Sequence, residues 1–158
     1  MHPAEGLAEQ VAEALAESGL APSRLILSFT EETLLTSSAA LVPELEAARR
    51  TGVRLCLDNY GMGHSLFALL ARISLDLVRV DVSALAARDD TDRALLVLAS
   101  IVGSAGDFGL VAIAGGIPTP ELSAAAFAVG ADLVHGRCQP RNLATADVAG
   151  LVTAVAAV

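Results

Sequence analysis

The residues of this chain with the clearest chemical potential lie in the run LDNYGMGHS, residues 57–65. An apolar stretch, Val53–Leu57, comes before Asp58 and Asn59, and two glycines follow close behind. This order is typical of a strand that delivers an acid and an amide to a loop at its carboxyl end, where α/β enzymes place their active sites. The Asp58 carboxylate could bind a hard cation there, or it could simply accept backbone N–H bonds in a tight turn.

Helical and strand-like segments alternate along the rest of the chain. Apolar periodicity, capping residues and glycines predict helices over residues 5–17, 37–50, 66–73, 91–104 and 145–156, and another that begins at Thr119-Pro120. The expected strands are the short apolar runs 24–29, 53–57, 77–80, 110–114 and 131–134. Apolar strands that alternate with helices imply a parallel sheet covered on both faces. The sequence therefore predicts an α/β fold, a partial TIM-type (β/α) barrel of about five parallel strands, because a full barrel needs about 250 residues.

Composition and charge narrow the class of protein further. The chain has 158 residues, of which 54% are hydrophobic and only 3% aromatic, and this fits a single domain with an aliphatic core. A net charge of −8 argues against nucleic-acid binding, because Lys and Arg contacts to phosphate supply most of that affinity. No apolar run reaches the roughly 18 residues of a membrane span, and the first residues lack the pattern of a secretory signal. With only two cysteines, the expected location is the cytoplasm and no membrane partner is expected.

Five segments of the chain, in order and at nearly native spacing, resemble motifs of EAL domains, a family of cyclic di-GMP phosphodiesterases. LILSFTE (25–31) is similar to LELEITE, and LDNYGMGHS (57–65) is similar to the start of LDDFGTGYSSL. LVRVD (77–81), VAIAGGIPT (111–119) and ADLVHG (131–136) then resemble LKID, VVxAEGVET and CDxxQG. The resemblance implies one EAL-like domain, residues 1–158, that lacks the first strands of the barrel and the EAL tripeptide itself.

The same resemblance implies a vestigial pocket of eight residues: Ser28, Glu31, Asp58, Asn59, Arg79, Asp81, Gly115 and His135. Ser28 and Asn59 stand where the family has metal-binding acids, and Gly115 stands where it has the glutamate that activates water. Two divalent cations need several carboxylates, so the resemblance implies no catalytic residues and a chain that is not an enzyme. No cofactor is expected; Mg²⁺ or Mn²⁺ would bind only if residual family metal binding survives, with Asp58 as the candidate ligand.

Several of these residues also have a purely structural interpretation. Glu31 could accept hydrogen bonds near the next loop. Asp81 could cap the chain locally, or it could pair with Arg79, which lies two residues away on the same strand face. Cys56 sits in the middle of a strand and should be an inert core thiol.

Part of a barrel leaves open strand edges and an uncovered inner face, which proteins pair or cover. The leading hypothesis is therefore a catalytically inactive bacterial signalling module that acts as a homodimer or through a protein partner covering the open barrel. The alternatives are a non-hydrolysing cyclic di-GMP receptor and the C-terminal half of a split phosphodiesterase. By resemblance to EAL-type dimers, the candidate interface contains Gly61, Met62, His64, Phe67 and Leu70.

Overall fold

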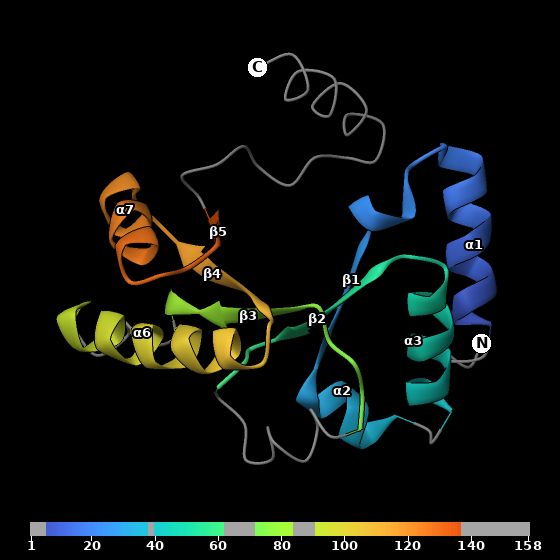
Figure 1. The fold of residues 1–158 in the computed structure, drawn as a ribbon, viewed down its shortest axis with the longest axis horizontal. Helices are drawn as coiled ribbons and strands as arrows, with labels where there is room; N and C mark the ends of the chain where they lie inside the picture. Colours follow the sequence, from blue (N-terminus) through green and yellow to red (C-terminus); the bar gives the residue numbers. More distant parts are fainter. Residues whose placement is uncertain (1–5, 38–39, 62–71, 84–90, 137–158) are drawn as a thin grey trace.

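A computed structural model describes residues 6–37, 40–61, 72–83 and 91–136 of the chain, and these form one parallel five-stranded sheet flanked by helices (Figure 1). The strands are β1 (Ile26–Thr30), β2 (Arg54–Asp58), β3 (Leu77–Asp81), β4 (Val111–Ile117) and β5 (Leu133–Gly136). They pair in the order β1-β2-β3-β4-β5, and every neighbouring pair is parallel. The predicted α/β fold with five parallel strands is confirmed.

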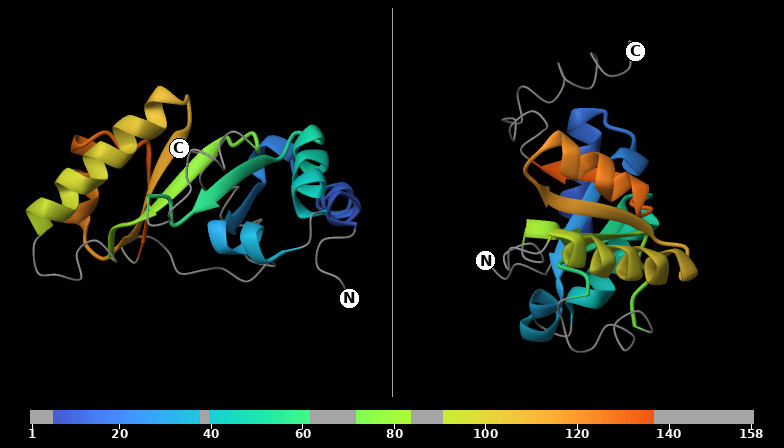
Figure 2. Two further views of the ribbon diagram at one scale, coloured as in Figure 1. Left: turned by 90° about the horizontal axis from the view of Figure 1, so that it is seen from below. Right: turned by 90° about the vertical axis from the view of Figure 1, so that its left-hand side faces the viewer.

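The helices pack in two groups beside the sheet (Figures 1 and 2). They are α1 (Leu7–Ser18), α2 (Glu31–Thr36), α3 (Leu41–Arg50), α6 (Thr91–Asp107) and α7 (Pro120–Ala128), with a short 3-10 turn, η1, over Pro22–Arg24. The helices α1 and α3 lie against each other near β1 and β2, whereas α6 and α7 lie near β4 and β5. None of the described helices is long and apolar enough to cross a membrane.

The helix predicted over residues 37–50 corresponds to α3, which starts at Leu41, whereas α2 over Glu31–Thr36 is an additional helix that was not predicted. The α2 helix begins at Glu31 because the Thr30 side chain accepts a hydrogen bond from the Thr33 N–H at 3.1 Å. It ends at Ser37, whose backbone is extended, and α3 then starts at Leu41. The predicted start of α7 is confirmed, since Thr119 caps it by accepting the Leu122 N–H.

The hydrophobic core lies between the helices and one face of the sheet. Leu55 and Leu57 of β2 and Val78 and Val80 of β3 are buried, and they belong to the same cluster as Leu98 of α6. Because successive strand side chains point to opposite faces, the residues between them point to the other, inner face. In β2 and β3, one face therefore delivers aliphatic residues to the core, and the other face carries the charged residues.

The inner face holds both the thiol and the charged residues of the central strands. Cys56 is buried there, and this burial raises the pKa of its thiol, which agrees with the prediction of an inert core cysteine. Asp58 lies two residues further along β2, at its carboxyl end. Arg79 and Asp81 lie on the same face of β3. The parallel register thus gathers the charged groups at one edge of the sheet.

Some predicted features fall on residues outside the described ranges. They are the helices over 66–73 and 145–156 and the interface candidates Met62, His64, Phe67 and Leu70. Gly61 is described: its φ is 86°, and a Cβ there would lie 2.8 Å from Cδ1 of Ile101. This glycine therefore serves packing against α6, while its role in an interface stays a prediction.

Candidate functional site

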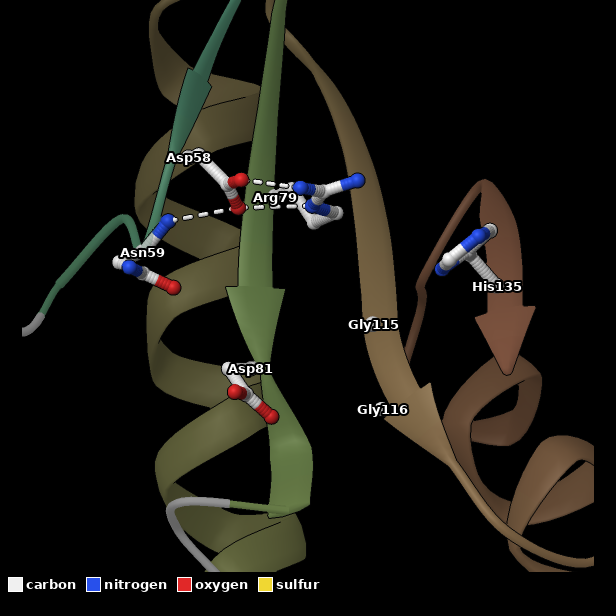
Figure 3. Close-up of a pocket in the computed structure, with 7 residues that line it drawn as sticks. All are labelled: Asp58, Asn59, Arg79, Asp81, Gly115, Gly116 and His135. Carbon is white, nitrogen blue, oxygen red and sulfur yellow. Dashed lines mark hydrogen bonds and ion pairs between the residues drawn. The ribbon is translucent and has the colours of Figure 1, made fainter. Parts of the chain in front are cut away.

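A cavity of about 310 Å³ opens at the carboxyl ends of β2 to β5 (Figure 3). The residues that line it are Asp58, Asn59, Arg79, Asp81, Gly115, Gly116 and His135. All but Gly116 belong to the pocket predicted from the sequence. They meet because the carboxyl ends of parallel strands lie at one edge of a sheet, the usual place for a ligand in α/β folds.

The centre of the pocket is an ion pair between Asp58 and Arg79. The two residues face each other across β2 and β3, and Arg79 Nε donates to Asp58 Oδ1 at 2.7 Å. Nη2 of the same guanidinium donates to Oδ2, so the pair is bidentate (Figure 3). The hydrogen bond to Asp58 raises the pKa of Arg79 despite its partial burial. The arginine is therefore a fixed, positively charged group.

Asp81 interacts with a different partner from the one that strand spacing suggests. Its Oδ1 accepts hydrogen bonds from the Ser83 N–H at 2.9 Å and from Ser83 Oγ at 2.6 Å, which confirms the local capping interpretation. The bidentate partner of Arg79 is Asp58, whose hydrogen bond raises the pKa of the arginine most, and the charge of Asp81 adds to that rise. Residues two apart on one strand are about 7 Å apart, whereas directly paired strands are only about 4.8 Å apart.

Gly116 is the pocket residue that the sequence-based prediction missed. Its φ of 71° lies in the left-handed region, and a Cβ there would be 2.5 Å from Asp81 Oδ1 and 3.0 Å from Ser83 Oγ. The adjacent glycines 115 and 116 at a strand end were the available signal, because such a pair often marks a close backbone approach.

Gly115 makes room for the arginine. A Cβ at this position would lie 3.1 Å from Cγ and 3.2 Å from Cδ of Arg79, and 3.3 Å from the Val80 carbonyl oxygen. These distances are tighter than ordinary van der Waals contact. The Arg79 side chain therefore fits in its observed position because residue 115 is a glycine.

The other predicted residues divide between the pocket rim and more distant positions. Asn59 has a φ of 57°, and its N–H donates to Asp58 Oδ1 at 3.0 Å, so Asp58 does accept a backbone bond in the turn. His135 of β5 faces the pocket from the opposite side (Figure 3). Ser28 and Glu31 do not line the pocket. Ser28 pairs with Cys56, which lies two residues before Asp58 in β2, and Glu31 is the first residue of α2.

Comparison with known proteins identifies the family. The EAL domain model matches residues 1–141. The cyclic di-GMP phosphodiesterase NbdA of Pseudomonas aeruginosa is 34% identical over 115 residues, 73% of this chain and 15% of that protein. The complex of the PaMucR phosphodiesterase with c-di-GMP matches with a TM-score of 0.77 and 25% identity, over 93% of this chain and 60% of that one. A manganese/cy-diGMP complex of Klebsiella pneumoniae BlrP1 has a TM-score of 0.69 and 29% identity, over 82% and 33%.

These matches confirm the barrel-type α/β fold, and the chain spans less than two thirds of each of these relatives. The BlrP1 complex holds manganese together with cyclic di-GMP, so the expectation that no cofactor binds has no support from the family. It remains a prediction for this chain.

The donors of the pocket do not form a ready metal centre. Both oxygens of Asp58 accept hydrogen bonds from Arg79, Asn59 offers a neutral amide, and Gly115 has no donor atom. Within the described ranges, no group of three or more His, Cys, Asp or Glu side chains could hold a metal ion. A divalent cation at Asp58 would first have to displace the guanidinium.

The expectation that the chain is not an enzyme is contradicted by the comparisons. NbdA and PaMucR are named phosphodiesterases, and the similarity to them extends over 73% and 93% of the chain. The expectation rested on the combined replacement of several family side chains, whereas the fold still brings acids, a cation and an imidazole together in one pocket. The family model covers residues 1–141 of 158, and the chain belongs to the EAL domain family.

Proposed function

We propose that this chain works in cyclic di-GMP signalling and that the cavity at the ends of β2 to β5 binds the cyclic dinucleotide. The observation that carries the proposal is the cavity of about 310 Å³, in which Arg79 and His135 supply hydrogen-bond donors. Its volume lies at the lower end of the range for small-molecule pockets, roughly 300–1,000 Å³. Hydrolysis of this dinucleotide, the activity in the name of NbdA, is the reaction to measure there.

The charge distribution of the chain favours a small anion bound at one specific site over a polyanion. A net charge of −8 repels polyanions over long distances, so an anionic ligand depends on a local cation in a concave site. The Arg79 guanidinium is such a cation, and its planar fork suits the oxygens of a phosphodiester. We therefore place a phosphate of the dinucleotide beside Arg79.

Isothermal titration of the 158-residue chain with cyclic di-GMP, with and without Mn²⁺, is expected to give a dissociation constant below about 10 μM in at least one condition. GMP, which has one base and no cyclic diester, is expected to bind at least about tenfold more weakly. Chromatography of the same samples measures the linear product of hydrolysis. The absence of saturable binding up to about 100 μM ligand in both conditions would overturn the proposal.

A second function, contact with a protein partner, is favoured by the edges of the sheet. Among the described strands, β1 and β5 each pair with one neighbour only. Leu133 of β5 is 44% exposed on the inner face. Because open edges and exposed apolar side chains favour association, we propose a homodimer or another protein partner at this side. The cytoplasm suits this role, since Cys56 is a free thiol.

Light scattering after size exclusion is expected to give about twice the 16.1 kDa of one chain. Leu133→Glu, at the exposed edge, is expected to shift the mass towards one chain. Leu96→Glu is the matched control, because Leu96 is also exposed but lies on α6. A wild-type chain that stays monomeric at every concentration would contradict the homodimer.

A further inference from the structure

The ion pair of Asp58 and Arg79 indicates how the pocket neutralises its ligand. We propose that the Arg79 guanidinium is the cation that binds a phosphate of the ligand, so that cyclic di-GMP binds to this chain without a divalent metal ion. This inference rests on the proposed binding of cyclic di-GMP to the pocket, and it concerns binding alone.

Both oxygens of the Asp58 carboxylate already accept hydrogen bonds. Its Oδ1 accepts hydrogen bonds from Arg79 Nε at 2.7 Å and from the Asn59 N–H at 3.0 Å, and its Oδ2 accepts one from Arg79 Nη2. The Asp58 side chain is only 18% exposed, so these charge-assisted bonds are weakly screened by water. A metal ion would have to break them before it could use either oxygen.

The Arg79 guanidinium keeps N–H groups that Asp58 does not bind. A guanidinium carries five N–H groups, and the bidentate pair with Asp58 uses two of them. One guanidinium nitrogen points away from Asp58, towards the side of the pocket where β4 and His135 lie (Figure 3). With 31% of the side chain exposed, these donors are open to a ligand. Asp58 thus holds one side of the arginine while the other side faces the cavity.

Close packing around Gly115 holds the Arg79 side chain in this position. The aliphatic part of Arg79 rests against Gly115, where a Cβ would lie 3.1 Å from Cγ and 3.2 Å from Cδ. Asp58 and Asp81 are the acids that line the pocket; the first pairs with Arg79 and the second accepts hydrogen bonds from Ser83. The guanidinium is therefore the group best placed to attract an anion.

The test is titration of cyclic di-GMP into the full chain in EDTA and in Mn²⁺. The two dissociation constants are expected to agree within about threefold.

In EDTA, Arg79→Met is expected to weaken binding by about twentyfold or more, because charge-assisted hydrogen bonds are lost. Arg79→Lys keeps the charge but loses the planar fork, so about tenfold weakening is expected. The control is Arg24→Met, an exposed arginine in η1 away from the pocket, which should change binding by less than about twofold.

Asp58→Asn distinguishes a phosphate site at Arg79 from a metal site at Asp58. Loss of its negative charge is expected to leave binding in EDTA at least as tight as in the wild type, because the amide oxygen can still accept a hydrogen bond from Arg79 and no carboxylate at position 58 repels the phosphate. If Asp58 instead served as a metal ligand, the same variant would lose binding in Mn²⁺.

Gly115→Ala tests the packing of the arginine independently of charge. It is expected to weaken binding several-fold, because the added methyl group crowds Arg79. Gly103→Ala is its control, since nothing lies within 4 Å of a Cβ at that position.

Loss of fold is distinguished from loss of binding by melting each variant. Arg79→Met leaves Asp58 unpaired, so the double variant Asp58→Asn plus Arg79→Met removes both partners and is also expected to lose binding. Binding only in Mn²⁺, abolished by Asp58→Asn, would overturn the inference and leave the proposed function intact. No binding in either condition would overturn the proposed function itself.

Discussion

Replacement of Gly136 by alanine is expected to detach β5 from β4 and to destabilise the chain by about 3 kcal/mol or more. Gly136 is paired with Ile117, and a Cβ at position 136 would clash with the Ile117 carbonyl oxygen and lie 2.6 Å from its nitrogen. Those are backbone atoms, so they cannot rotate away as a flexible side chain could. One of the two strands must move, and the pairing of Gly136 with Ile117 is lost.

Thermal unfolding followed by circular dichroism measures this effect. A loss of 3 kcal/mol corresponds to a melting temperature lower by roughly 6 to 12 °C in a chain of this size. The matched control is Gly106→Ala in α6, where nothing lies within 4 Å of an added Cβ. That change should raise stability by about 0.5 to 1 kcal/mol, because alanine favours helix. Equal melting temperatures for Gly136→Ala and the wild type would show that β4 and β5 do not approach this closely.

Replacement of Asp76 by alanine has the second largest expected effect, a loss of about 2 to 3 kcal/mol. The Asp76 carboxylate accepts the Leu55 N–H at 2.9 Å and binds both Nε and Nη2 of Arg49, at 3.1 and 2.8 Å. Leu55 is fully buried, so alanine at position 76 leaves a buried N–H without its partner. The ion pair adds less to the expected loss, because the Arg49 side chain is 37% exposed.

The contribution of Asp76 is expected to depend on pH. Burial acts to raise the pKa of Asp76, but the hydrogen bonds from Arg49 and Leu55 outweigh it and hold the pKa below its ordinary value. A carboxyl with a depressed pKa stabilises the folded state above its unfolded pKa, about 3.9, and loses that contribution as the pH falls through its folded pKa. The difference in stability between wild type and Asp76→Asn should therefore be full at pH 7 and shrink below about pH 4.

Asp132 provides a matched comparison for Asp76. Its carboxylate accepts the Ala112 N–H at 2.8 Å, and its own N–H donates to the Ala112 carbonyl at 3.0 Å. Asp76 makes the same two bonds with Leu55. Because Asp132 has no arginine partner among the described residues, Asp132→Ala should cost less, about 1 to 2 kcal/mol. Equal melting temperatures for Asp76→Ala and the wild type would show that the Asp76 carboxylate does not stabilise the start of β2.

Much of the fold could be predicted from local sequence, because local physics decides those features. The five strands are rich in apolar residues, and Thr119 followed by Pro120 is a common start of a helix. The family was also readable, since its motifs recur in order along the chain. The α2 helix was not predicted, because its start depends on the backbone turning at Thr30, where the side chain acts as the N-cap.

The candidate site was only partly predictable. Six of the residues that the family resemblance named line the cavity, because each lies near the carboxyl end of a strand and parallel strands bring those ends together. The partner of Arg79 was not predictable, since sequence spacing points to Asp81 and strand register selects Asp58. The closeness of Gly116 to Asp81 is likewise a distance between two strands that no local pattern encodes.

The sequence by itself determined the family, the order of the elements and the residue types at the pocket, because periodicity, capping and motif spacing are written along one chain. Only the tertiary structure decided which charges meet. Pairing between β2 and β3 sets Arg79 opposite Asp58, and pairing between β3 and β4 sets Gly115 beneath the arginine. The physical reason is that hydrogen-bond register between strands, and not distance along the chain, fixes which side chains come within a few ångströms of each other.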